Sequence, residues 1–432
     1  MAHSGHQLSQ VRSAPRQLVI SAAATLALVS TAPSMRAQAS VSDSGARAIT
    51  VSLSYTGELV GDAAGGTRRG TTALGVAGAQ LTLSLRRLVD WPHARAFLFV
   101  IGTHGGAPSD LVGDVQGVSN IQAPAGVRLE EAWLQQNLAG DRLSLLVGRY
   151  DLSTEFYRLQ SGALFINSSF GFGPELAQSG VAGPSIFPKT SVGGRVELKP
   201  SPNVVWRTAV LNGAPVGGGG GIRLFAAPVG ALFVSEVALL SRPDTAGMPM
   251  HPRFQIGRGV TRPFFGKIAV GGWYYTARFS DLVDTLSTGA PVRHRGSRGL
   301  YLIGDQTVWA AGRGRPGVLT AFIQLGVGDG RVNQVGGYVG GGVTRTAPFA
   351  GRAQDELGLG VATALSGSHY QRAQLSASSR ATDAETAIEL TYLTQLGSWL
   401  AVQPDVQYVI HPGNAQATRS AIVPGLRIAL SR

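Results

Sequence analysis

The sequence predicts an all-β protein, a transmembrane antiparallel β-barrel of about 16 strands with short periplasmic turns and longer extracellular loops. Composition, an N-terminal export segment and a period-two hydrophobic pattern support this fold class. The chain of 432 residues contains 59 glycines, and only 14% of its residues are charged. It contains no cysteine, which excludes disulfide scaffolds, thiolate zinc sites and cysteine nucleophiles. This composition is unusual for a cytosolic enzyme and typical of a large β-structure.

Residues 1–39 are predicted to be a secretory signal peptide, which leaves residues 40–432 as one outer-membrane β-barrel domain. Two arginines and no acid precede a short apolar run at residues 18–32, and Ala37–Ala39 forms a small-residue cleavage site. This order of charged, apolar and small residues is that of a signal peptide. The apolar run has about 15 residues, whereas a spanning helix needs about 20. We therefore expect the mature chain to start at Ser40.

Several segments of about ten residues carry polar side chains on one face and apolar side chains on the other. In residues 191–199, Arg195 and Glu197 alternate with valine and leucine. Residues 385–395 and 400–410 follow the same pattern. A soluble β-sandwich also alternates, but it rarely extends to about 400 residues as one unit. The pattern therefore favours transmembrane strands around a water-filled lumen.

The connections between the predicted strands differ in length in a regular way. The sequence indicates short connections at residues 139–141, 200–202 and 396–398, and long ones at residues 151–188 and 212–222. Periplasmic turns of outer-membrane barrels are short and extracellular loops are long. Counting back from a periplasmic C-terminus, residues 396–398 come out periplasmic and residues 411–418 extracellular. Both halves of the chain agree with this assignment.

A set of motifs along the whole mature chain resembles one known family. They include RLEEAWLQQ (Arg128–Gln136), DRLSLLVGRYDLSTEF (Asp141–Phe156), LFINSSFG (Leu164–Gly171), GGWYYTARF (Gly271–Phe279) and ETAIELTYLTQLGSWLAVQPDVQYVIHPG (Glu385–Gly413). In this order they resemble the carbohydrate-selective porins of the OprB type. The resemblance implies a sixteen-stranded barrel in the bacterial outer membrane that admits glucose-like small sugars to the periplasm by facilitated diffusion.

The same resemblance sets expectations about partners. We expect small sugars as the substrate, outer-membrane lipid around the barrel, and the barrel-assembly machinery during biogenesis. We expect no cofactor, no metal and no nucleic acid, and the oligomeric state stays open between monomer and trimer. Outer-membrane barrels usually end in an aromatic residue, but the last outward position here is Arg432. The C-terminal strand is therefore expected to be a weak assembly signal.

A sugar-selective lumen needs planar polar groups that exchange hydrogen bonds with hydroxyls, together with aromatic rings that contact the C–H faces of the sugar. Alternation places Leu129 on the luminal face of its strand, and it places Glu130 on the lipid face, near the headgroups or in a subunit interface. The loop at residues 151–188 is expected to fold inward as a constriction, with Asn167, Ser168, Ser169 and Phe170 at its centre. The candidate pore-lining residues are Glu131, Trp133, Gln135, Arg195, Glu197, Glu389, Gln403, Asp405, Gln407 and Arg427.

The motifs and charges of the chain also bear on functions other than sugar transport. The sequence has no G-x-S-x-G elbow, no H-E-x-x-H and no phosphate-binding loop. An anion-selective or general diffusion porin is an alternative, since the net charge is +12 and rings of arginine select anions. The predicted luminal acids Glu131, Glu197, Glu389 and Asp405 argue against anion selectivity. An outer-membrane lipase would need a lipid-facing Ser–His pair, and alternation aligns none. We therefore expect no enzymatic activity.

Overall fold

The computed structural model describes residues 47–215, 225, 228–241, 266–312, 316–376 and 382–431. The predicted signal peptide, the start at Ser40 and the terminal Arg432 lie outside the described residues, so what the sequence predicts for them stays a prediction. Part of the predicted loop 212–222 also lies outside them. Within the described residues, no helix is long and apolar enough to cross a membrane.

The described chain forms one antiparallel sheet that closes on itself. Each long strand pairs with the next along the chain, and β1 pairs with both β3 and β17, which closes the ring into a sixteen-stranded barrel with β2 as a short addition. The predicted fold class is confirmed. The strands are β1 (Ile49–Asp62), β2 (Ala64–Gly66), β3 (Gly70–Ser84), β4 (Ala94–Gly105), β5 (Gly126–Leu138), β6 (Leu143–Tyr150), β7 (Ser191–Ser201), β8 (Val204–Asn212), β9 (Ala231–Leu240), β10 (Gly266–Thr285), β11 (Pro291–Ala310), β12 (Val318–Gly328), β13 (Val335–Thr346), β14 (Glu356–Ser366), β15 (Ala384–Gln395), β16 (Leu400–Ile410) and β17 (Arg419–Ser431).

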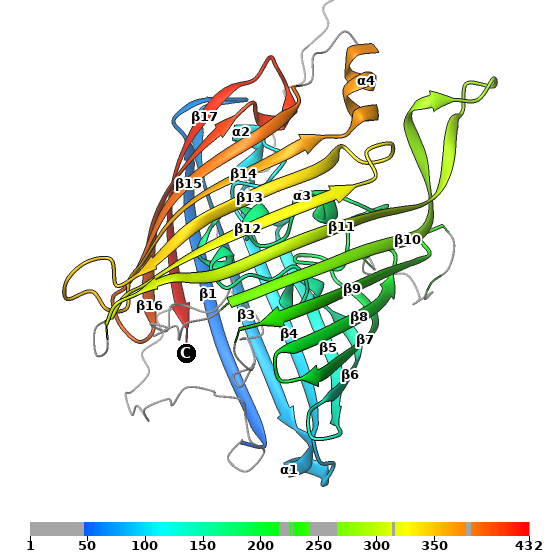
Figure 1. Cartoon of the computed structure of the whole chain (residues 1–432). Helices are drawn as coiled ribbons and strands as arrows, with labels where there is room; N and C mark the ends of the chain where they lie inside the picture. The colour runs from blue at the N-terminus through cyan, green and yellow to red at the C-terminus, as the bar shows by residue number, and fades with distance from the viewer. Residues whose placement is uncertain are drawn as a thin grey trace, which may run out of the picture. The chain divides into compact units, whose positions relative to one another are not determined.

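The two ends of the barrel differ. The C-terminus and the short helix α1 (Leu85–Val89) lie at the lower end in Figure 1, where the connections 139–142 and 396–399 are short. The helices α2 (Ser109–Val112) and α4 (Ser368–Ser376) lie toward the opposite end, in longer connections. Short turns mark the periplasmic end of outer-membrane barrels. We call the two ends the turn end and the loop end.

The outer face of the strands is apolar. Outward positions such as Val270 (54% exposed), Leu300 (62%) and Leu390 (47%) leave much of their side chain uncovered. The inward neighbours in sequence are buried, as Glu389 and Ala269 illustrate. An exposed apolar band on every strand matches the hydrocarbon core of a membrane, because lipid rather than water covers it.

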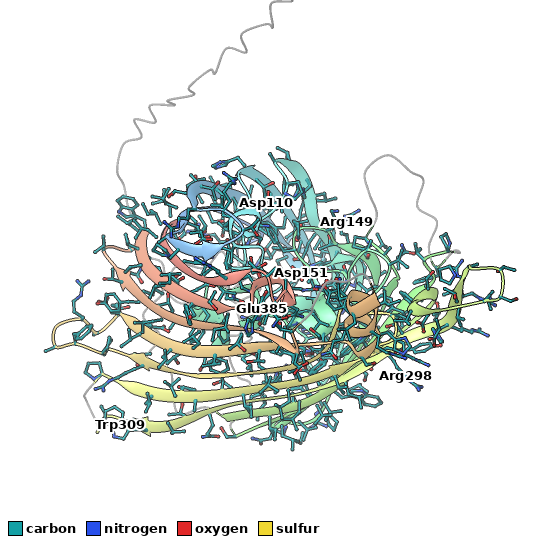
Figure 2. All side chains as sticks on the ribbon, turned by 90° about the horizontal axis from the view of Figure 1, so that it is seen from above. Asp110, Arg149, Asp151, Arg298, Trp309 and Glu385 are labelled. Carbon is teal, nitrogen blue, oxygen red and sulfur yellow. The ribbon has the colours of Figure 1, made fainter. Side chains whose placement is uncertain are left out.

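Two connections at the loop end fold into the barrel and fill much of its interior. Residues 106–125 carry α2, and residues 151–190 carry three short 3-10 helices and α3 (Pro174–Ala177). Viewed down the barrel, Asp151 of the second connection lies inside the ring of strands (Figure 2). Glycines in the wall make room for this connection. A Cβ on Gly360 would lie 2.7 Å from Phe170 Cζ, so a larger residue there would push the loop away.

One stretch of strand β5 departs from simple alternation. Phe99 of β4 pairs with Glu131, but Val100 pairs with Leu129, so Glu130 is an extra residue in a β-bulge. The bulge turns Leu129 outward, where it is 41% exposed, and the expected luminal position of Leu129 is wrong. Glu130 is only 1% exposed, and its backbone oxygen accepts a hydrogen bond from Thr190 Oγ1. The chain itself therefore covers Glu130, and the expected placement among lipid headgroups is wrong.

Candidate functional site

The ten candidate pore-lining residues all point into the barrel, and each is 9% exposed or less. Strict alternation on β7, β15, β16 and β17, and on β5 beyond its bulge, gives this placement. Their neighbours inside the barrel are the two inward connections. Most of these polar groups therefore contact other parts of the chain.

Two of the candidate acids hold the second inward connection by its backbone. Glu131 Oε1 accepts a hydrogen bond from the Asp151 amide at 2.8 Å. The two oxygens of Glu389 accept from the amides of Ile166 at 2.6 Å and Asn167 at 2.9 Å. Inside the barrel these backbone N–H groups are shielded from water, so the acceptor on the wall satisfies them. Each acid thus anchors one point of the loop to the wall.

Further luminal acids, which the sequence analysis did not select, do the same. Glu236 on β9 accepts from the Tyr157 amide at 2.8 Å, and Asp305 on β11 accepts from the Ser161 amide at 3.0 Å. Glu385 on β15 binds the first inward connection through the amides of Val115 at 2.8 Å and Gln116 at 3.0 Å. Figure 2 places Glu385 inside the ring of strands. Glu58 on β1 accepts from Ser119 Oγ at 2.6 Å.

The candidate amides and Arg427 complete the attachment. Gln403 Nε2 donates to the Leu164 carbonyl at 2.7 Å, and Gln407 Nε2 donates to the Val118 carbonyl at 2.8 Å. Gln407 also donates to its neighbour Asp405 at 3.1 Å. Arg427 pairs with Glu58 and donates to Asn120 Oδ1 at 2.5 Å. These side chains attach both inward connections to the inner face of the barrel.

The predicted centre of the constriction loop packs against the wall. Asn167 is fully buried and donates from Nδ2 to Gln407 at 3.0 Å, and its own oxygen accepts from the Ser169 amide. Ser169 Oγ donates to Gln116 at 2.9 Å. Phe170 lies against Phe165, with 4.4 Å between ring centroids. Ser168 is half-buried. The predicted inward fold of this loop is therefore present, with its tip fixed to the barrel.

A row of paired charges lies between strands β7 and β8 and the second inward connection, and several of its members are partly exposed. Arg195 donates from Nε and Nη2 to the two oxygens of Glu155 at 2.8 Å and 2.9 Å. Arg207 donates to Glu197 at 2.5 Å, and Lys199 lies 3.5 Å from the same carboxylate. The side chains of Glu155, Arg207 and Lys199 are 22%, 16% and 30% exposed. We call these five residues the charged row.

The environment sets the protonation of two acids in the second inward connection. Burial would raise the pKa of Glu155, but Arg195 and Arg207 outweigh burial and hold the pKa below its usual range. Burial raises the pKa of Glu175 to about 7, although the hydroxyl of Tyr157 donates to it at 3.0 Å. Glu155 is therefore charged at neutral pH, and Glu175 titrates near neutrality.

The last two candidates lie on β5 above the turn end. Trp133 stacks on Phe97 with 5.0 Å between ring centroids and is 5% exposed. Gln135 Nε2 donates to Asn137 at 2.8 Å. The indole of Trp133 belongs to a buried aromatic pair, and little of its face is open to a solute.

These observations define a class of protein. A closed sixteen-stranded barrel, with an apolar outer band and a polar lumen narrowed by inward loops, is an outer-membrane porin. Residues 68–431 match the model of the carbohydrate-selective porin, OprB family. The chain belongs to the carbohydrate-selective porin family of the OprB type, and it is a sugar porin of the bacterial outer membrane.

Individual relatives agree with the family. The chain is 25% identical over 419 residues to Porin B of Pseudomonas aeruginosa, covering 87% of this chain and 86% of that protein. Its fold is similar to the high-pH structure of Pseudomonas putida OprB, with a TM-score of 0.76 and 21% identity over 89% of this chain and 94% of the other. The outer-membrane channel DcaP of Acinetobacter baumannii has a TM-score of 0.51 and 11% identity, covering 89% of this chain and 97% of its own.

The candidate set from the sequence lacks Glu58, Glu155, Arg207, Glu236, Asp305 and Glu385. All of these except Glu155 stand at inward positions of regular strands, so alternation applied to β1, β8, β9, β11 and β15 would have found them. Glu155 lies in a connection without periodicity. Its only sequence signal is a carboxylate in a loop expected to fold inward.

Proposed function

We propose that small neutral sugars cross this porin along the charged row, with Arg195, Glu197 and Arg207 on the wall and Glu155 on the loop. The observation that carries this proposal is the bidentate Arg195–Glu155 pair, which joins the barrel wall to the inward loop next to a second pair, Arg207–Glu197. In the first pair the partly exposed group is the Glu155 carboxylate, and in the second pair both Arg207 and Glu197 are partly exposed.

The chemistry of a sugar suits such a row. A hydroxyl both donates and accepts hydrogen bonds, so it can bind a guanidinium edge and a carboxylate edge of the same pair. Each arginine is already neutralised by an acid, and a neutral solute therefore meets little net field. Contacts shared with water are weak enough for release, which conduction requires.

The residues that hydrogen-bond the two inward connections act on the shape of the lumen and not on the sugar itself. Glu131, Glu389, Gln403, Asp405, Gln407 and Arg427 shape the lumen by holding the inward connections, and Asn167–Phe170 form the fixed side of the constriction. Trp133 and Gln135 point inward near the turn end and support the wall there, Trp133 by packing on Phe97 and Gln135 by bonding Asn137. Sugars pass without chemical change, so the proposal includes no catalytic step.

The proposal extends to the surroundings of the barrel. Outer-membrane lipid covers the outward apolar band, and the barrel-assembly machinery inserts the chain. The described residues favour neither a monomer nor a trimer.

Liposome swelling tests the charged row. We expect Glu155→Gln and Arg207→Gln to change the ratio of glucose to mannitol rates several-fold, because each removes one charged partner of a solute contact worth about 1.5–3 kcal/mol before water replaces it. Arg298→Gln is the matched control, because Arg298 is exposed at the edge of the barrel (Figure 2). Unchanged ratios in both row variants would contradict the proposal.

Ion selectivity separates this proposal from the anion-selective alternative. Arg195 and Arg207 each pair with a carboxylate, which favours a channel of low charge selectivity. Reversal potentials in a salt gradient should therefore stay small. A potential close to that of chloride would support the anion-selective alternative.

A further inference from the structure

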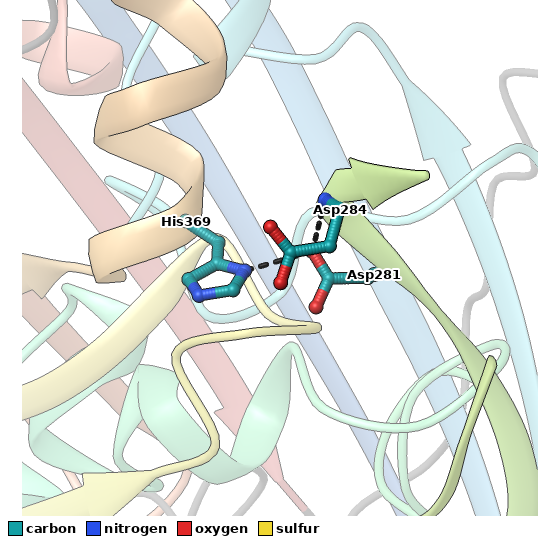
Figure 3. Close-up of side chains that lie close together, drawn as sticks. All are labelled: Asp281, Asp284 and His369. Atoms are coloured by element: carbon teal, nitrogen blue, oxygen red, sulfur yellow. Dashed lines mark hydrogen bonds and ion pairs between the residues drawn. The ribbon is translucent and has the colours of Figure 1, made fainter. Parts of the chain in front are cut away.

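A cluster of potential metal ligands lies at the loop end, away from the charged row. Asp281 and Asp284 belong to β10, and His369 belongs to the first turn of α4, in the connection between β14 and β15. The side chains converge in Figure 3 although 88 residues separate Asp281 from His369. We infer that these three residues bind a divalent transition-metal ion, with Zn²⁺ as the best match.

The geometry is close to that of a three-ligand site. One potential ligand atom from each residue lies within 4.8 Å of the other two. His369 Nδ1 lies 2.7 Å from Asp281 Oδ1, and the side chains of Asp281 and His369 are 0% and 9% exposed. Asp284 is exposed and leaves one side of the cluster open to solvent. The two buried ligands would hold an ion in a fixed position, and the exposed ligand would let the ion enter from solvent.

Charge also favours a cation. Asp281 and Asp284 bring two carboxylates together. In the described part of the chain, Asp281 accepts from the amides of Val283 and Asp284 and contacts the imidazoles of His294 and His369. The nearby Arg331 is already paired with Asp329 at 2.8 Å. A divalent ion would neutralise both carboxylates and remove their mutual repulsion.

The ligands are held in place by their surroundings. His294 Nε2 lies 2.7 Å from Asp281 Oδ2, so His294 orients this carboxylate from the side opposite His369. The amide of His369 donates to the Gly330 carbonyl at 3.2 Å, and the amide of Leu282 donates to the Arg331 carbonyl at 3.1 Å. The connection between β12 and β13 thus fixes both ligand-bearing segments. Such outer contacts support metal affinity.

The donor set selects the class of ion. One imidazole nitrogen and two carboxylate oxygens suit Zn²⁺, which binds nitrogen and oxygen at about 2.0–2.2 Å and accepts a water as its fourth ligand. The present Nδ1–Oδ1 contact would have to open by a few tenths of an ångström. Metal binding at Nδ1 would replace the hydrogen bond that this atom now forms with Asp281 Oδ1. The bound ion would join α4 to β10 across the mouth of the barrel.

Metal titration of the folded, detergent-solubilised porin tests the site. Isothermal titration with Zn²⁺, and the visible spectrum of bound Co²⁺, should detect one ion that is lost in both His369→Ala and Asp284→Asn. Bound Zn²⁺ should also slow tryptic cleavage after Arg372, because Arg372 lies one turn beyond His369 on α4. His93→Ala, at the turn end, is the matched control and should bind as the wild type does.

The result of this test does not depend on whether sugars follow the charged row, because none of the three proposed ligands belongs to the charged row. Asp284 is exposed, so Asp284→Asn should fold even where His369→Ala does not. Absence of binding to the wild type would overturn the inference. Equal binding by the wild type and both variants would also overturn it, since the ion would then sit elsewhere.

Discussion

Glu389 and Asn167 are joined inside the barrel although 222 residues separate them in the sequence. Glu389 Oε2 accepts a hydrogen bond from the Asn167 amide at 2.9 Å, while Oε1 accepts from the preceding amide, of Ile166. A single carboxylate on the wall thus satisfies two consecutive backbone donors of the loop. The position of this loop inside the barrel is therefore fixed by contacts with the wall.

Removing this anchor should loosen the constriction. Glu389→Ala leaves two buried amides without their acceptor, and a buried donor without a partner costs about 1–3 kcal/mol. We expect the loop near Asn167 to move into more than one position. Swelling rates for a disaccharide should therefore rise several-fold relative to those for glucose.

Thr363→Val is the control for this experiment. Thr363 lies on β14 and bonds Thr386 of the neighbouring strand at 3.0 Å, so the change alters the wall without touching the loop. Equal disaccharide rates in Glu389→Ala and the wild type would show that the loop is held without Glu389.

The barrel and the facing of its strands follow from local sequence. Arg195 and Glu197 point inward and Val196 is 42% exposed on the outside, as period-two alternation predicts. The strand period is a local property, since successive side chains of a strand point to opposite faces of the sheet. The same rule fails at Leu129 because a bulge in β5 adds one residue, and nothing in the residue types there marks the bulge.

Partners within the lumen could not be predicted from the sequence. Alternation puts Glu389 inside the barrel, but it cannot say whether water, sugar or a loop amide meets the carboxylate. The same limit applies to Asp281 and His369, whose contact depends on how two connections fold over the barrel mouth. Long-range contacts of irregular segments are set by the packed structure and not by any sequence period.

The pH response of the loop should depend on Glu175. Its pKa is raised to about 7 by burial, whereas a carboxyl released into water titrates near 4.5. Docking of α3 is therefore most favourable below pH about 4.5 and weakens as pH rises through about 7, because a charge must then stay buried. Amide exchange in Pro174–Ala177, corrected for its intrinsic pH dependence, should increase across this window.

Glu175→Gln provides the comparison. The amide keeps the size of the side chain and can still accept from Tyr157, but it does not ionise in this range. The corrected exchange rate should then be independent of pH. A pH step that persists in Glu175→Gln would assign the response to another group.

Trp133→Ala should destabilise the barrel interior. The indole is 5% exposed and stacks on Phe97, so truncation leaves a cavity in a buried aromatic pair. Such changes cost about 3–5 kcal/mol in protein cores. We expect a lower urea midpoint for unfolding in lipid, while Trp133→Phe should recover most of the loss. An unchanged midpoint for Trp133→Ala would place the ring in water instead.

Neighbouring positions on β15 should respond differently to charge because they face different media. Leu390 is outward and 47% exposed near the middle of its strand, next to the inward Glu389. An arginine on the lipid face near the bilayer midplane costs about 2–4 kcal/mol, but about 0–1 kcal/mol near the interfaces. Leu390→Arg should therefore lower the folded fraction, measured by the mobility shift between unboiled and boiled samples on a gel. Leu396→Arg, in the turn after β15, is the matched change and should fold as the wild type does. Equal folded fractions for the two variants would mean that Leu390 does not face the hydrocarbon core.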